Sequence, residues 1–256
     1  MRNLTSLITV LALSFSTTTL VACATSGDEI TAADDADATG AGKFDMWQSA
    51  DGWHFHLKSG NGRILLTSEA YSARTGAING ILSVLDNGVD TQQYAVVPAA
   101  NGYLLHLNAG NNEIISFSQV YSTKSNATRA ITSCVKAVTS YLDKMEANTS
   151  GARVQVEQGA TDQFRFNVFA QNGEIVLSSE SYTTAGAAWN GAYAVQDAAA
   201  TSANFALKTS ADGRYYFTLT ALNGQVVGTS QMYATKEAAT SGIASVQGAI
   251  KGMTIL

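Results

Sequence analysis

The chain has 256 residues, a formal net charge of −5 and only 14% charged side chains. Arg2 contributes +1 and five acidic residues between positions 24 and 42 contribute −5, which leaves −1 for residues 43–256. This balance lacks the basic excess that nucleic-acid-binding domains use to contact phosphates, so we expect no nucleic-acid partner. The 214 residues after position 42 are enough for two domains of about 100 residues, each with its own core.

Residues 1–22 have the features of a bacterial signal peptide. Arg2 supplies the positive start, and the apolar stretch Leu7–Phe15 is too short to span a bilayer. The stretch ends at Leu20-Val21-Ala22-Cys23, which resembles the lipobox of bacterial lipoproteins, whose cysteine thiol receives a diacylglycerol. The resemblance implies lipidation of Cys23 and a cell-envelope anchor, and Ala24 favours the outer membrane if the cell has one. An ordinary signal peptide that carries a cysteine is the alternative.

Residues 23–42 predict a flexible acidic tether. Ile30 is its one sizeable apolar side chain, so the segment cannot bury enough surface to offset the entropy lost on ordering. A coil also does not hold carboxylates in place as cation ligands, so we interpret the acidic residues as solvated charges. They are Asp28, Glu29, Asp34, Asp35 and Asp37.

A pattern of about 50 residues occurs four times after the tether. Each copy has an Asn-Gly or Asn-Asn pair, an apolar run, a Ser-x-x-Tyr sequence and a segment of small residues. The tyrosines are Tyr71, Tyr121, Tyr182 and Tyr233, spaced 50, 61 and 51 residues apart. This periodicity predicts a tandem array. The polar stretch 146–151 and the longer central spacing predict two domains of two repeats each, residues 43–147 and 152–256.

The first repeat predicts three strands followed by a helix. Residues 44–47, 53–57 and 63–70 have strand character, and 53–57 alternates apolar and polar side chains. Turns are expected at Asp51-Gly52 and at Asn61-Gly62, with both residues of the second pair at positive φ. The fourth repeat is expected to share both turns, whereas the third has a longer first turn near residues 159–162.

The segment after each tyrosine predicts an amphipathic helix. Small and apolar residues at positions six, ten and thirteen after the tyrosine form one helix face. A hydroxyl residue one or two positions after the tyrosine is the expected N-cap: Ser72, Ser122, Thr183 and Thr235. Position nine holds Gly80, Ala130, Gly191 and Gly242. Glycine inside a helix costs about 1 kcal/mol relative to alanine, so its recurrence indicates close packing against the sheet or a neighbouring helix.

The order of Asn-Gly, apolar strand, Ser-Glu-x-Tyr and Asn-Gly-Ile across residues 61–81 resembles the YegP-like family. These are small bacterial tandem-repeat domains without an assigned biochemical role. The resemblance implies an α+β fold in which two β-β-β-α repeats form one antiparallel sheet with both helices on one face. The resemblance covers residues 43 to about 250. It is strong in repeats one and four, fair in repeat three and weakest in repeat two. It implies no catalytic residues.

Three groups of side chains invite a chemical interpretation, and we expect each to be structural. A metal could be ligated by His54, His56 and His106. However, the position of His56 holds Asn167 and Thr218 in other repeats, which indicates a polar position that faces outward. We therefore expect no metal and no cofactor. Cys134 occupies a position held by valine elsewhere and is interpreted as a core residue.

The motif tyrosines could stack on a sugar or a peptide, but their recurrence favours a role at the sheet–helix corner, with each hydroxyl bonded to the backbone. Trp47, Trp53 and Trp189 are expected in the core or at its edge. These patterns predict a lipid-anchored, non-catalytic cell-envelope protein with an envelope protein or polysaccharide as partner. An envelope hydrolase or metal-dependent enzyme is the alternative, and a structural lipoprotein without a specific ligand is a third.

Overall fold

The computed structural model describes residues 40–148, 150–159 and 161–251. The expected signal peptide, Cys23 and the acidic residues of the tether lie outside this range. The described chain divides into two compact units, residues 40–147 and 148–251. Within these residues, no helix combines the length and the apolar character that crossing a bilayer requires.

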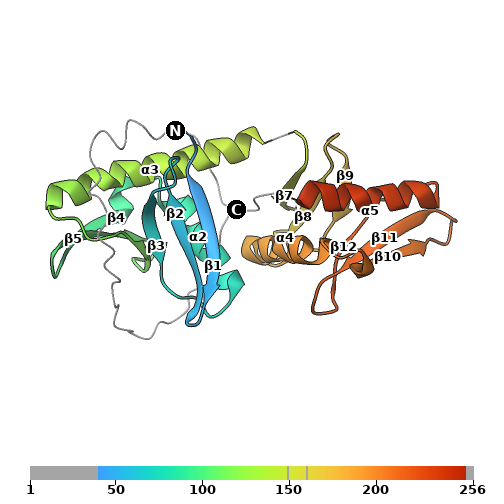
Figure 1. Ribbon diagram of the computed structural model, residues 1–256, viewed down its shortest axis with the longest axis horizontal. Coiled ribbons are helices and arrows are strands. Elements are labelled where there is room, and N and C mark those ends of the chain that lie inside the picture. The colour runs from blue at the N-terminus through green and yellow to red at the C-terminus, as the bar shows by residue number, and fades with distance from the viewer. Residues whose placement is uncertain (1–39, 149, 160, 252–256) are drawn as a thin grey trace. The chain divides into compact units, whose positions relative to one another are not determined.

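The first unit contains repeats one and two (Figure 1). Its strands form one antiparallel sheet in the order β1-β2-β3-β6-β5-β4, so the third strands of the two repeats meet at the centre, with Thr67 opposite Phe117. In chain order the elements are β1 (Lys43–Ser49), β2 (Gly52–Lys58), β3 (Ile64–Ser68), α2 (Arg74–Asn87), the 3-10 turn η1 (Thr91–Gln93), β4 (Tyr94–Ala99), β5 (Gly102–Asn108), β6 (Ile114–Phe117) and α3 (Lys124–Ala147).

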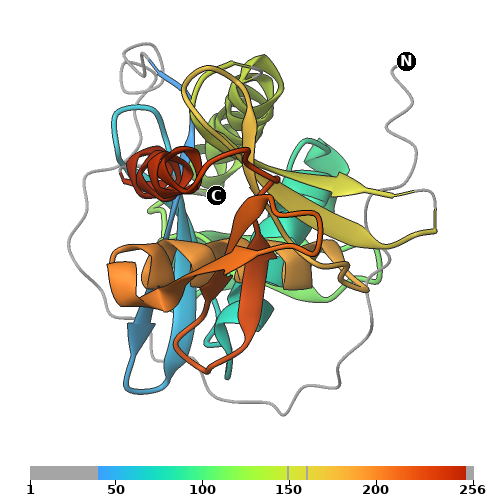
Figure 2. The ribbon, with the colours of Figure 1, turned by 90° about the vertical axis from the view of Figure 1, so that its right-hand side faces the viewer.

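The second unit repeats this plan. Its sheet has the order β10-β11-β12-β9-β8-β7, and the two third strands pair at Ser178 and Thr229. The elements are β7 (Arg153–Gln158), β8 (Phe164–Phe169), β9 (Ile175–Ser178), α4 (Ala185–Ala199), η2 (Ser202–Asn204), β10 (Phe205–Thr209), β11 (Tyr215–Thr220), β12 (Val226–Thr229) and α5 (Lys236–Ile250). Figures 1 and 2 show α4 and α5 beside this sheet from two directions.

Each core lies between the sheet and its two helices. Alternation along the strands places Phe55 and Leu57 of β2 in the core with no exposed surface, while His54 and His56 lie on the opposite face. We call this opposite side the outer face. The helix positions six and thirteen after each tyrosine are fully buried in all four repeats: Ala77, Val84, Ala127, Cys134, Ala188, Val195, Ala239 and Val246. The α+β fold of tandem β-β-β-α repeats with helices on one sheet face is therefore confirmed.

The turns differ from the sequence expectation in two respects. In the Asn61-Gly62 turn only Gly62 has positive φ, at +88°, and Asn112 takes the same conformation in repeat two. A Ser59 N–H to Arg63 C=O bond of 2.9 Å closes a longer turn than the expected two-residue hairpin. The first turn is also long in repeat four, where Ser210 N–H donates to Arg214 C=O, so repeat four resembles repeat three here rather than repeat one.

The helix N-caps lie two residues after each tyrosine. Thr235 was predicted correctly, because its side chain accepts a hydrogen bond from the Ala238 N–H. The predictions for the other three helices were one residue too early: Ala73, Thr123 and Thr184 occupy the cap position instead of Ser72, Ser122 and Thr183. The bulged corner described below sets this distance, which sequence preference for a hydroxyl residue does not reveal.

Candidate functional site

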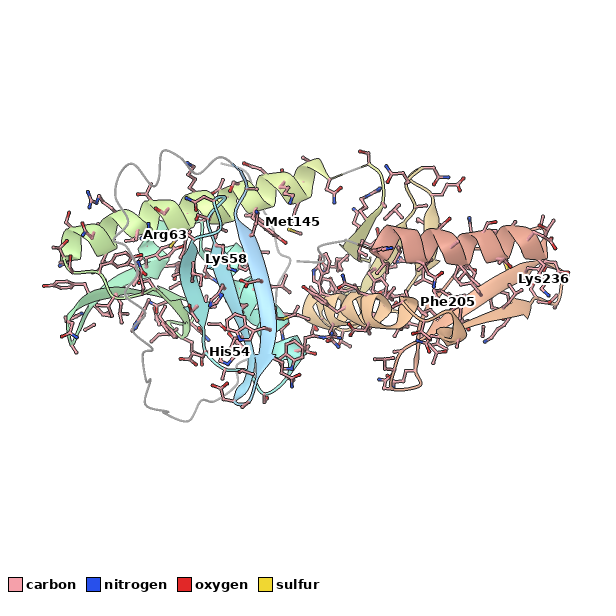
Figure 3. The ribbon with its side chains drawn as sticks, viewed as in Figure 1. His54, Lys58, Arg63, Met145, Phe205 and Lys236 are labelled. Carbon is pink, nitrogen blue, oxygen red and sulfur yellow. The ribbon has the colours of Figure 1, made fainter. Side chains whose placement is uncertain are left out.

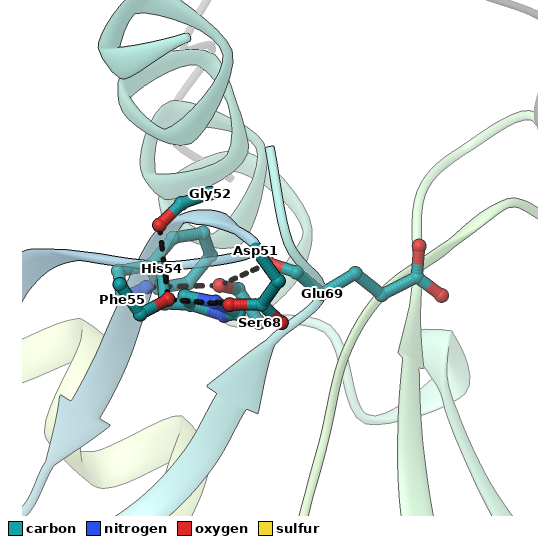
Figure 4. A network of polar contacts seen from close by, with 7 residues as sticks. Asp51, Gly52, His54, Phe55, Ser68 and Glu69 are labelled. Atoms are coloured by element: carbon teal, nitrogen blue, oxygen red, sulfur yellow. Dashed lines mark hydrogen bonds and ion pairs between the residues drawn. The ribbon is translucent and has the colours of Figure 1, made fainter. Parts of the chain in front are cut away.

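The Ser-x-x-Tyr sequence forms a bulged corner at the end of each third strand, and Figure 4 shows Ser68 and Glu69 of the first corner. Ser68 Oγ accepts a hydrogen bond from the Phe55 N–H at 2.9 Å and donates one to the Glu69 carbonyl at 2.8 Å. Tyr71 then exchanges two backbone hydrogen bonds of 2.8 Å with Trp53. Between these two contacts, β2 runs two residues, from Phe55 to Trp53, while the other segment runs three, from Ser68 to Tyr71. The corner therefore contains one extra residue, which is a β-bulge. Ser118, Ser179 and Ser230 accept the equivalent bond at the same length.

In repeats one, three and four, the ring of the motif tyrosine and a strand phenylalanine both pack against the helix glycine. The Phe55 and Tyr71 ring centroids are 6.2 Å apart with an interplanar angle of 18°. A Cβ on Gly80 would lie 2.4 Å from the Tyr71 hydroxyl oxygen, too close for any real contact. Gly191 and Gly242 have the same relation to Tyr182 and Tyr233. The glycine therefore serves close packing, because its missing side chain leaves room for the tyrosine of its own repeat.

Repeat two replaces two members of this group together. Leu105 takes the place of the phenylalanine, Ala130 that of the glycine, and Tyr121 is only 1% exposed. A leucine leaves space that a phenyl ring would fill, so it removes the contact with the phenylalanine that a Cβ at the helix position makes in the other repeats. The exception in repeat two thus follows the same packing logic as the other three.

Burial raises the pKa of three of the motif tyrosines. It raises the pKa of Tyr71 to about 12, with a smaller contribution from Glu69, and it also raises the pKa of Tyr182 and Tyr233. A phenol with a raised pKa is a poor general base near neutral pH. Among the described residues, the buried Tyr233 hydroxyl has no backbone hydrogen-bond partner, contrary to the sequence expectation. Whether these tyrosines are structural or ligand-binding stays a prediction.

The β1–β2 hairpin carries a serine, an aspartate and a histidine in one network (Figure 4). Ser49 Oγ donates to Asp51 Oδ1 at 2.5 Å, and His54 Nε2 lies 3.0 Å from the same oxygen. The Ser49 bond, followed by the His54 bond, lowers the pKa of Asp51 to about 2. Activation of a serine requires the histidine in the middle, in contact with the hydroxyl. Here the carboxylate is in the middle, so this network stabilises the turn and does not activate Ser49.

His54 and His56 lie on the outer face of β2, beneath Trp47 (Figure 3 labels His54). The Trp47 ring stacks on His54 at 5.3 Å and contacts His56 at 4.3 Å between centroids. His56 Nδ1 lies 3.4 Å from Asp45 Oδ1, and burial lowers the pKa of His56 despite this carboxylate. The expected outward direction is correct, but the side chain is only 18% exposed because its neighbours cover it.

The third histidine does not join this pair. His106 is on β5, separated from β2 by β3 and β6, which corresponds to roughly 14 Å at the usual strand spacing. Among the described residues, no group of three or more His, Cys, Asp or Glu side chains is placed to hold a metal ion. Cys134 is fully buried in α3 and faces the core, as expected from its valine equivalents. Trp189 is 7% exposed, whereas Trp47 and Trp53 are half-buried.

The second unit has a groove on its outer face that sequence reasoning missed. Its volume is about 590 Å³ and it lies where β9 and β12 meet. Eight residues line it: Glu174, Ile175, Ser178, Ser179, Glu180, Thr229, Ser230 and Gln231. Alignment of the repeats contains a signal for it, because the equivalent of Thr229 in repeat two is the much larger Phe117.

Comparison with known proteins identifies the domain class. The family model described as a domain of unknown function (DUF1508) matches residues 48–94, 99–140, 160–205 and 210–255, one match in each repeat. The chain therefore belongs to this family of unknown function, and four copies of the domain cover most of its length.

The curated relatives are named as UPF0339 proteins. The UPF0339 protein YegP of Escherichia coli K12 is 40% identical over 93 residues, which cover 36% of this chain and 84% of that protein. A UPF0339 protein of Bordetella pertussis is 47% identical over 85 residues, covering 33% of this chain and 77% of that protein. The solution structure of YegP from E. coli, described as a protein of unknown function, has a TM-score of 0.39 and 36% identity, covering 41% of this chain and 90% of that one.

Proposed function

We propose that this protein is a lipid-anchored component of the cell envelope whose YegP-like repeats form non-catalytic binding or spacing modules. The observation that carries the anchor is the sequence Leu20-Val21-Ala22-Cys23 directly after a short apolar stretch. The cysteine would carry the lipid, and the acidic residues up to position 42 would separate the membrane from the folded repeats. If the cell has two membranes, Ala24 favours the outer one.

Support for a non-catalytic role comes from the conspicuous residues of the repeat. The motif serines use their hydroxyls to replace backbone hydrogen bonds, and the motif tyrosines pack against helix glycines. Groups committed in this way are not available as nucleophiles or bases. The enzyme alternative, a hydrolase or a metal-dependent enzyme, needs titratable groups that converge on one pocket, and no observation on the described residues favours it.

The anchor is tested with the Cys23→Ala variant of the full chain. We expect the wild-type protein in the membrane fraction, with a lipid-modified cysteine at its N-terminus by mass spectrometry, and the variant outside that fraction. A Cys134→Ala variant is the matched control, since it removes the other cysteine and should leave fractionation unchanged. Membrane association of Cys23→Ala, together with an unmodified wild-type N-terminus, would disprove the anchor.

A further inference from the structure

We propose that the groove beside β9 binds an extended, lysine-bearing segment of a partner protein. The proposal rests on the binding role given above and names a class of ligand for it. Its basis is a combination of charge, open space and an incompletely paired strand, all at one place in the second unit.

The groove has a carboxylate at each end. Glu174 precedes β9 and Glu180 follows it, and both residues are exposed. No described basic side chain forms an ion pair with either one. Two unpaired carboxylates on a shallow surface attract a segment that carries positive charge.

In the first unit, the positions equivalent to two groove residues carry the opposite charge and a larger side chain. Its equivalents of Glu174 and Thr229 are Arg63 and Phe117. The first unit thus places a guanidinium and an aromatic ring from its own chain where the second unit has a carboxylate and a small hydroxyl residue. Repeat three is the one repeat with glutamate at both positions. In repeats one, two and four, the equivalents of Glu174 are Arg63, Glu113 and Gln225. The equivalents of Glu180 are Glu69, Gln119 and Gln231.

The strand beside the groove favours an extended ligand. β9 pairs with β12 only between Ser178 and Thr229, whereas it pairs with β8 at Ile175, Leu177 and Ser178. Ile175 lines the groove and is 40% exposed. Glu174 and Glu180 are six positions apart, which corresponds to at most about 20 Å of extended chain, the length that a peptide of about six residues covers. Extended peptides commonly bind along incompletely paired strands, with side chains in flanking pockets.

The test measures binding of three probes to the full chain in detergent micelles by isothermal titration calorimetry. The first is a blocked hexapeptide that alternates lysine and threonine, the second replaces its lysines by glutamine, and the third is spermidine. We expect saturable binding of the lysine peptide alone. The Glu174→Gln/Glu180→Gln variant should weaken it about tenfold or more, and Thr229→Phe, which introduces the first unit's residue, should do the same. Thermal melts check that both variants are folded.

The matched control is Glu69→Gln/Glu113→Gln, which removes the same charge from equivalent positions in repeats one and two. It should leave the dissociation constant within about twofold. An equal loss in this control would reduce the effect to general charge attraction and overturn the proposal. Absence of saturable peptide binding, or binding of spermidine without the peptide, would also overturn it. The anchor is unaffected by these outcomes, because it is judged from fractionation of Cys23→Ala.

Discussion

At the residue scale, the hydroxyls of Tyr71, Tyr182 and Tyr233 lie where a helix side chain would otherwise extend. Gly242 shows this most clearly, because a Cβ there would lie 2.2 Å from the Tyr233 hydroxyl oxygen and 3.0 Å from Phe217 Cε1. Gly248, six residues further along the same helix, has nothing within 4 Å of the equivalent position. The two glycines therefore differ in packing while sharing one helix.

This pair gives a direct prediction. Gly242→Ala should destabilise the second unit by about 1–2 kcal/mol, since overpacking costs about 1–3 kcal/mol and alanine returns at most about 1 kcal/mol of helix propensity. Gly248→Ala should instead raise stability, by up to about 1 kcal/mol, because it gains propensity without a clash. Urea denaturation followed by circular dichroism measures both changes.

Repeat two provides the compensating substitution. If leucine makes room for alanine there, Phe217→Leu combined with Gly242→Ala should cost less than the sum of the single changes, with a coupling free energy of at least about 1 kcal/mol. Strict additivity of the two substitutions, or a stabilising Gly242→Ala, would contradict the packing explanation of the glycine.

At the element scale, α2 lacks the side-chain cap that the three other described helices have. Its N-cap residue Ala73 has extended backbone angles, φ −139° and ψ 151°, and no side-chain hydrogen bond, whereas Thr184 and Thr235 cap α4 and α5. Ala73→Thr should therefore stabilise the first unit by about 1 kcal/mol, and Ser72→Ala should change little. A denaturation experiment in which Ser72→Ala is the more damaging change would restore Ser72 as the cap.

The sequence predicted the elements and their order because their signals are local and repeated. Period-two alternation marked β2, and four aligned copies marked the buried helix positions. Turn geometry and caps were missed by one or two residues, because a bulge adds a residue without changing composition. The pairing of Tyr71 with Gly80 also could not be derived, since it depends on how the helix lies over the sheet.

For the candidate sites too, some features could be predicted from the sequence and others could not. Placement of His54 and His56 on one face followed from strand periodicity, and the core position of Cys134 from repeat alignment. The order of Ser49, Asp51 and His54 in their network and the groove at Glu174 required three-dimensional information. A groove formed by two repeats is invisible to any pattern read within one repeat.

At the scale of the whole molecule, each unit has its own sheet and core. The longer helix α3 closes the first one, with Tyr141 packed edge-to-face on Phe44 at 5.1 Å between centroids. We predict that residues 43–147 and 152–256, expressed separately, each unfold in one cooperative transition. Circular dichroism melts of both halves test this. A half that is unfolded alone, although the full chain melts in one transition, would contradict the division.

The central claim is that the tyrosines of the fourfold Ser-x-x-Tyr corner hold the fold and do not bind a ligand. Thermal and urea unfolding of the four full-chain variants Tyr71→Ala, Tyr121→Ala, Tyr182→Ala and Tyr233→Ala tests it most directly. We expect each to lose about 3–5 kcal/mol, the cost of removing a packed aromatic ring, and the four Tyr→Phe controls to lose less than about 1 kcal/mol. Melting temperatures of all four Tyr→Ala variants equal to that of the wild type would contradict the claim and assign these tyrosines to a binding surface.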